Sequence, residues 1–184
     1  MKKLISLLVL MLGFGLVFTG CSDDDDDNYP VYVDYDTIAE VYELDLSIGN
    51  FAPKEAKDTL SYYFRKNFTL DYDSDQLLVY RQRGETDSKK PVWELLPSTY
   101  YNTQGVVSYN FDFSKEDFSI YVDADYNIKA LTPEYLTDQT FRIVIIPGYF
   151  PQSKGVAPPV DYNDYDAVIK YFNINDSKIK TLKL

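Results

Sequence analysis

Most of this chain alternates apolar and polar residues with a period of two, which is the pattern of β-strands that bury one face. Val107, Tyr109 and Phe111 share one parity, for example, and polar residues stand between them. Prolines end several of these runs, as at Pro97 and Pro147. The pattern predicts strands at residues 38–48, 62–70, 76–81, 92–96, 107–113, 118–122 and 141–146.

The last part of the chain has a different period. A candidate N-cap, Asn163 or Asp164, precedes apolar residues at helical spacing, and further apolar residues near the C-terminus indicate a final edge strand. Short strands separated by turns are typical of a sandwich or a barrel. The predicted fold is all-β: an immunoglobulin-like antiparallel β-sandwich of about seven or eight strands with one short C-terminal helix.

The N-terminus has the composition of a signal peptide. Lys2 and Lys3 precede an apolar run at residues 4–17, which is too short to span a bilayer, and small residues then lead to Cys21, the only cysteine. The segment resembles a bacterial lipoprotein signal, which implies an acylated Cys21; an ordinary signal peptide is the alternative. The predicted organisation is a signal peptide at 1–20, a lipidated cysteine and acidic tether at 21–36, and a single β-sandwich domain at 37–184.

A run of aspartates follows Cys21 almost directly. Ser22, Asp23, Asp24, Asp25 and Asp26 resemble the export signal of surface lipoproteins in the Bacteroidetes. That resemblance implies an outer-membrane, lipid-anchored protein exposed on the cell surface. The alternatives are a solvated acidic spacer and a protein that stays in the periplasmic leaflet.

A wider resemblance rests on the order of four segments. Residues 78–81, 93–97, 109–113 and 141–147 follow one another as in a group of small Bacteroidetes surface lipoproteins. The group brings no activity that can be carried over to this chain.

Charge narrows the set of partners. The whole chain has a formal net charge of −11; removing residues 1–20 takes away two of 18 basic side chains and none of 29 acidic ones, which leaves −13. Nucleic acid and anionic lipid surfaces repel such a chain. Nucleic acid is therefore excluded as a partner, and the membrane is expected to be reached through the lipid anchor only.

Candidate chemistry is limited by what the chain lacks. It has no histidine, which excludes a Ser-His-Asp triad and a histidine metal site. It also has no nucleophile-elbow, phosphate-loop or dinucleotide motif. Paired carboxylates are the remaining catalytic option, but with 29 acids such pairs arise by chance. We therefore predict a protein that is not an enzyme and has no cofactor.

One acidic segment has calcium-like spacing. Asp123, Asp125 and Asn127, with Glu134, match the oxygen positions of an EF-hand loop. Ile128 stands where that loop requires glycine. We therefore predict solvated acidic side chains in a loop and no metal site. Asp123, Asp125 and Asn127 are the weak candidates for calcium.

Aromatic residues supply the candidate ligand contacts. The chain has 18 tyrosines and 11 phenylalanines, and outward tyrosines can stack on sugar rings or contact proteins. The alternative is that they are ordinary strand formers. The candidate contacts are Tyr100, Tyr101 and Tyr121, with Tyr63 and Tyr80 as further outward residues; Trp93 is expected in the core between the sheets.

Two functions follow from these observations. The first is a non-catalytic binding or interaction module for a glycan or a protein, displayed on the cell surface. The second is a structural or accessory subunit of an envelope complex with no ligand of its own. Thr37 and Thr59 each lie in an Asp-Thr-apolar triplet that resembles the O-glycosylation signal of the Bacteroidetes, and they are candidate glycosylation sites.

Overall fold

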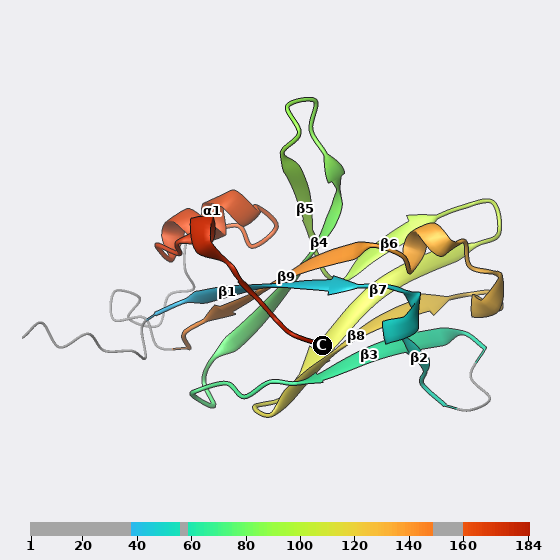
Figure 1. Ribbon diagram of the computed structural model, residues 1–184, viewed down its shortest axis with the longest axis horizontal. Coiled ribbons are helices and arrows are strands. Elements are labelled where there is room, and N and C mark those ends of the chain that lie inside the picture. The colour runs from blue at the N-terminus through green and yellow to red at the C-terminus, as the bar shows by residue number, and fades with distance from the viewer. Residues whose placement is uncertain (1–37, 56–58, 149–159) are drawn as a thin grey trace, which may run out of the picture. The chain divides into compact units, whose positions relative to one another are not determined.

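The computed structural model describes residues 38–55, 59–148 and 160–184, all within the unit Asp34–Leu184. These residues form a β-sandwich of two sheets with five strands each (Figure 1). The predictions at Cys21, at Ser22, at residues 23–26 and at Thr37 lie outside the described residues. None of the described helices is long and apolar enough to cross a membrane.

The two sheets are assembled from strands that are far apart in the chain. The first sheet has the order β10-β1-β9-β4-β5 and the second has the order β2-β3-β8-β7-β6. The strands of the first sheet are β1 (Glu40–Leu46), β4 (Gln76–Glu85), β5 (Pro91–Leu95), β9 (Gln139–Ile146) and β10 (Lys180–Thr181). Those of the second are β2 (Ala52–Pro53), β3 (Ser61–Asn67), β6 (Ser98–Tyr101), β7 (Val106–Phe113) and β8 (Asp117–Ala124). The described helices are α1 (Tyr165–Tyr171) and four 3-10 helices: η2 (Ile48–Asn50), η3 (Ile128–Ala130), η4 (Pro133–Tyr135) and η5 (Asp176–Lys178).

The interior between the sheets is made by the inward parity of the strands. Tyr109, Ile120 and Phe141 are fully buried there, together with Leu44 and Leu46 of β1. Burying one such side chain contributes about 1.5–3 kcal/mol to folding. The apolar interior confirms the all-β sandwich that the alternation predicted.

A second hydrophobic cluster lies on the outer face of the first sheet, under α1. Asp164 caps this helix by accepting a hydrogen bond from the Ala167 amide at 3.0 Å, so Asp164 is the cap and Asn163 is not. Val168 is fully buried in the cluster, against residues such as Val144 of β9. The first sheet is thus covered on both faces, which explains why β4 and β9 carry almost continuous apolar runs.

The structure has more strands than the sequence predicted. The described part of the chain forms ten strands where seven or eight were expected, because β2 and β6 have only two and four residues, too few to show a period. β4 also extends to Glu85, past a register shift between Gln82 and Gly84, so it is longer than the strand predicted at residues 76–81. Together β4 and β5 form a hairpin that projects from the first sheet (Figure 1).

One edge of the first sheet departs from the antiparallel pairing of the other strands. The final strand, β10, pairs parallel with β1, in the register Tyr42 with Lys180 and Glu43 with Thr181. A parallel pair needs a long connection, and the chain between β1 and β10 includes most of the domain. The immunoglobulin-like arrangement stays a prediction.

Candidate functional site

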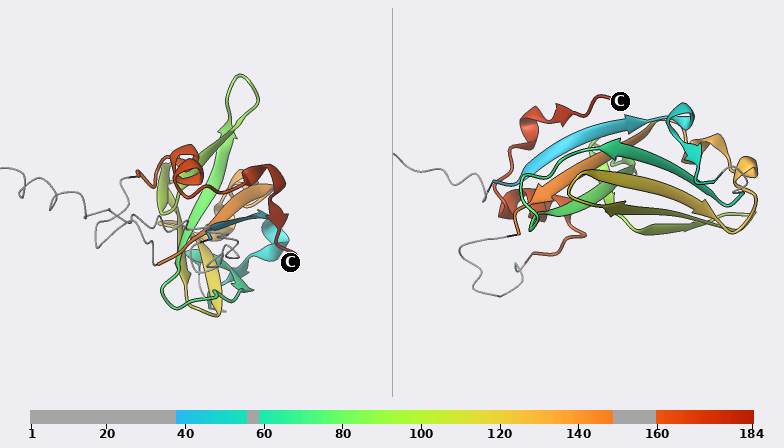
Figure 2. Two further views of the ribbon diagram at one scale, coloured as in Figure 1. Left: turned by 90° about the vertical axis from the view of Figure 1, so that its left-hand side faces the viewer. Right: turned by 90° about the horizontal axis from the view of Figure 1, so that it is seen from below.

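Two tyrosines lie side by side on the outer face of the second sheet. Tyr63 of β3 stands directly opposite Tyr121 of β8, with ring centroids 6.2 Å apart and ring planes inclined by 22°. Both are half-buried. The Lys54 Nζ lies 5.1 Å from the centroid of the Tyr121 ring. β3 and β8 run beside each other in Figure 2, right-hand view.

Hydrogen-bonding side chains surround this pair at the neighbouring outward positions. Asn110 of β7 is the cross-strand neighbour of Tyr121 and donates a hydrogen bond of 3.0 Å to Asp123. Tyr121 donates its hydroxyl to Asp112 at 2.7 Å. We name the set Tyr63, Tyr121, Asn110, Asp112 and Asp123 the tyrosine face.

The Tyr121 hydroxyl of this face is a hydrogen-bond donor near neutral pH. Partial burial raises the pKa of Tyr121, and the hydrogen bond to Asp112 raises it further, so the phenol keeps its proton. Ser61 also donates to Asp123. A carboxylate offers about four acceptor sites, so both aspartates can take further donors from a ligand. The face offers stacking surface and acceptors.

The sequence-predicted tyrosines are not brought together. Tyr121 belongs to the tyrosine face, whereas Tyr101, on the edge strand β6, is 83% exposed and stands apart from it. Tyr100 points into the interior: its hydroxyl donates to Glu94 and its ring packs edge-on against Tyr109 at 5.8 Å. Burial raises the pKa of Tyr100, and the hydrogen bond to Glu94 raises it further. Tyr100 is thus part of the packing.

Two aromatic predictions are wrong. Tyr80 does not face out: it is fully buried under α1 and donates a 2.7 Å hydrogen bond to the Tyr162 carbonyl. Trp93 does not lie between the sheets either. It packs on the other side of the first sheet, under α1, with the Arg142 guanidinium 4.3 Å from its ring centroid. The sequence did not show that a helix covers this face, so Tyr80 was taken as exposed and Trp93 was assigned to the only interior that was expected.

Asn110 and Asp112 were not among the site residues predicted from the sequence. Their signal was present, because both belong to the polar parity of the 107–113 run. What was missing was the sheet order that sets β7 beside β8 and β8 beside β3. Only this order places the polar parity of one strand beside the aromatic residues of two others.

The calcium candidates have other partners. Asp125 accepts the Val106 amide at 2.8 Å and lies against Gly105, where a Cβ would come within 2.1 Å of its carboxylate. Asn127 caps η3 by accepting the Lys129 amide at 3.1 Å, and Asp123 belongs to the tyrosine face. Across residues 38–55, 59–148 and 160–184, no group of three or more cysteine or acidic side chains is placed to hold a metal ion.

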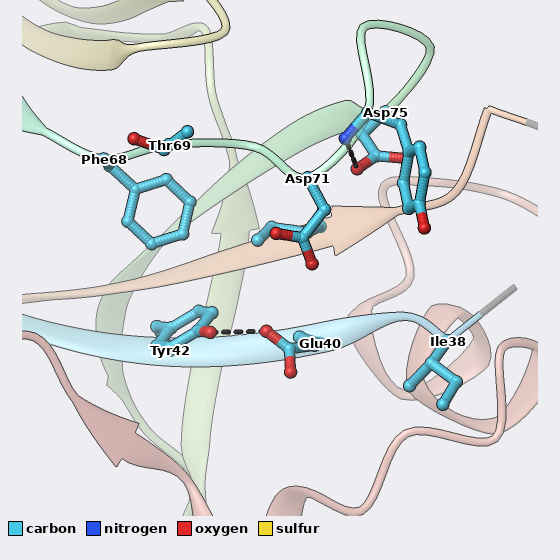
Figure 3. Close-up of a pocket in the computed structure, with 9 residues that line it drawn as sticks. Ile38, Glu40, Tyr42, Phe68, Thr69, Asp71 and Asp75 are labelled. Carbon is cyan, nitrogen blue, oxygen red and sulfur yellow. Dashed lines mark hydrogen bonds between the residues drawn. The ribbon is translucent and has the colours of Figure 1, made fainter. Parts of the chain in front are cut away.

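A cavity of about 340 Å³ lies between β1 and the segment that follows β3. Figure 3 shows Glu40 and Tyr42 on one side of it and Phe68 and Asp71 on the other. Ile38 and Ile145 also line it. The lining is therefore mixed, with carboxylates beside aromatic and aliphatic surface.

The acidic groups of this cavity already serve the fold. Glu40 accepts the Tyr42 hydroxyl and pairs with Lys180 at 3.6 Å. Asp75 is buried, which raises its pKa, and it accepts the Tyr72 amide at 3.2 Å within its own turn. These contacts tie β10 and the β3–β4 loop to their neighbours. The tyrosine face is therefore the stronger candidate for a ligand.

Thr59 is exposed in the loop before β3, and its backbone carbonyl accepts the Ile128 amide at 2.7 Å. This hydrogen bond holds the backbone that carries the Thr59 side chain.

Comparison of the chain with protein-family models, with curated proteins and with solved structures found no match.

Proposed function

We propose that this chain is a surface-exposed, outer-membrane lipoprotein whose folded domain is a non-catalytic binding module for a glycan or a protein, acting through the tyrosine face. One observation carries the proposal: the Tyr63–Tyr121 pair stands on an outward sheet face, whereas the cluster under α1 contains no residue of the second sheet. Aromatic rings kept at the surface and flanked by hydrogen-bonding groups are typical of binding surfaces.

Binding is tested with the full mature lipoprotein in detergent micelles, on arrays of defined glycans and of purified extracellular proteins. A saturable ligand is expected, and Tyr63→Ala and Tyr121→Ala should each weaken it. Tyr101→Ala is the matched control, because it removes a more exposed tyrosine of the same sheet that lies outside the tyrosine face. A ligand lost in all three variants alike, or no ligand on either array, contradicts the proposal.

The anchor and the export signal are tested on cells. Antibody should label intact cells, and added protease should remove the protein. Changing residues 23–26 to alanine should keep the protein inside the cell without unfolding it. Equal surface labelling of the wild type and the alanine variant would refute the export step. A stoichiometric envelope partner after mild crosslinking, with no array ligand, would favour an accessory subunit.

Glycosylation at Thr59 and Thr37 is proposed on the triplets that contain them. The intact mass of the native protein should exceed that of peptide plus lipid, and Thr59→Val should remove one glycan. Thr99→Val is the control, because Thr99 is exposed on β6 outside any such triplet. A native mass equal to peptide plus lipid contradicts this modification.

A further inference from the structure

The tyrosine face is built as a row across three strands. Tyr63, Tyr121 and Asn110 occupy matching positions on β3, β8 and β7. The pairing of these strands is continuous over the whole length of β3 and from Val107 to Phe113 of β7. Neighbouring strands lie about 4.8 Å apart, so the row extends over roughly 10 Å. This length suits an extended chain of sugar rings lying across the strands.

The side chains along the row are complementary to the two kinds of group on a sugar ring. Pyranose rings present C–H groups, which pack on aromatic rings, and hydroxyl groups at their rim, which need acceptors and donors. Tyr63 and Tyr121 supply the rings. Asp123 lies on one side of the row and Asp112 on the other, since their cross-strand neighbours are Ser61 and Ser119. Carboxylates only accept, so they select for hydroxyl donors.

The charges on this face oppose an anionic ligand. Among the outward positions of β3, β7 and β8, Asp112, Asp117 and Asp123 are acidic, and Arg65 is the cation. Arg65 already donates to Asp117 at 2.9 Å. Lys54 lies over the Tyr121 ring and adds one further cation at the edge. The whole chain carries −11, so uronic or sulfated sugars meet net repulsion.

We infer, on the basis of the proposed function, that the ligand of the tyrosine face is a neutral polysaccharide chain lying across β3, β8 and β7. Stacking on Tyr63 and Tyr121 provides the contact area. Asp112, Asp123 and Asn110 bind the hydroxyls on either side. An anionic polysaccharide of similar length meets repulsion from Asp112 and Asp123, because Asp117 is paired with Arg65.

The test is affinity electrophoresis of the full mature lipoprotein in detergent micelles. Neutral probes are mixed-linkage β-glucan, galactomannan and pullulan; anionic probes are alginate, polygalacturonate and chondroitin sulfate. At least one neutral probe should retard the protein, and the anionic probes should not, at low or high salt. Tyr63→Ala and Tyr121→Ala should each weaken retardation about fivefold. Tyr101→Ala should leave it unchanged.

Three outcomes overturn the inference. The first is retardation by anionic probes only, lost at high salt. The second is neutral binding that is indifferent to Tyr63 and Tyr121. The third is a protein ligand that depends on both tyrosines with no polysaccharide bound, which refutes the ligand class while supporting the proposed function. Thermal unfolding of each variant separates lost binding from lost folding.

Discussion

The two outer faces of this sandwich use the same residue types in opposite ways. On the first sheet, the guanidinium of Arg142 lies 4.3 Å from the Trp93 ring centroid and 4.9 Å from that of Tyr165, and α1 seals the arrangement. On the second sheet, Lys54 lies over Tyr121 at 5.1 Å and no part of the α1 cluster reaches it. The presence of tyrosines beside a cation therefore does not identify a site. What differs is whether another element covers them.

Burial gives the covered face a structural role. The Arg142 side chain is only 13% exposed; its Nη1 donates to the Tyr165 hydroxyl at 2.5 Å. Its Nε lies 3.5 Å from a Glu43 carboxylate oxygen but makes no hydrogen bond. The Arg142 guanidinium therefore interacts mainly with the rings of Trp93 and Tyr165 and with the Tyr165 hydroxyl, and its ion pairs are long. It holds the sheet and α1 together, whereas the described α1 cluster contains no residue of the tyrosine face.

The largest expected difference between the faces is in stability. Tyr80→Ala should lower the free energy of unfolding by about 4 kcal/mol, because it leaves a cavity under α1 and removes the hydrogen bond to Tyr162. Tyr121→Ala should lower it by less than about 1 kcal/mol. Urea unfolding of the mature chain measures both. Equal losses would mean that both faces are structural.

The second prediction concerns Arg142. Arg142→Met keeps apolar bulk between Trp93 and Tyr165 but removes the charge, and should cost about 2 kcal/mol. Arg65→Met on the second sheet is the control, since Arg65 forms an exposed pair and little change is expected. An Arg142→Met variant as stable as the wild type would show that packing alone holds α1 on the sheet.

The sequence predicted the strands that bury one face and the helix, because both depend on local periodicity. The 107–113 and 118–122 runs became β7 and β8, and the helical run near the C-terminus became α1 (Tyr165–Tyr171) with its cap at Asp164. The candidate site was predicted only in part. Tyr121 was found, but Asn110 and Asp112 were not, because their role depends on strand order.

The errors have physical causes. A strand with two buried faces still alternates in direction, so parity alone does not distinguish a residue in solvent from one under a helix. The prediction for Tyr80 was wrong for this reason, whereas Trp93 was expected in the interior and instead packs on the opposite face of the first sheet. The prediction that Tyr100 faces outward was wrong because its side chain points inward. The guanidinium of the buried Arg81 donates a hydrogen bond to the Tyr100 hydroxyl at 3.1 Å.

The third prediction is a pH dependence of the covered face. Burial raises the pKa of Tyr165 to about 12, although Arg142 opposes the shift. The unfolded value is about 10, so the folded state holds this proton more tightly. The contribution of the Tyr165 hydroxyl to stability is therefore fully present below pH 10 and is lost as the pH rises toward 12.

Tyr165→Phe should therefore reduce the loss of stability between pH 9 and pH 11 by about 1 kcal/mol. Urea midpoints at the two pH values measure the effect. The loss of the Arg142 hydrogen bond lowers stability at both pH values and cancels in the difference. An unchanged slope would mean that Tyr165 titrates as an exposed phenol.

The smallest expected effect tests the tyrosine face itself. Tyr63 and Tyr121 form one cross-strand pair, and such pairs contribute about 0.2–1 kcal/mol to stability. A double-mutant cycle with Tyr63→Ala and Tyr121→Ala should give a coupling free energy within that range, because solvent competes for both rings. The affinity for a neutral polysaccharide should fall in each single variant and further in the double variant, since one stacked ligand contacts both rings. A coupling free energy above about 2 kcal/mol would show that the pair serves the fold, as Tyr80 and Tyr165 do on the opposite face, and the contrast between the faces would disappear.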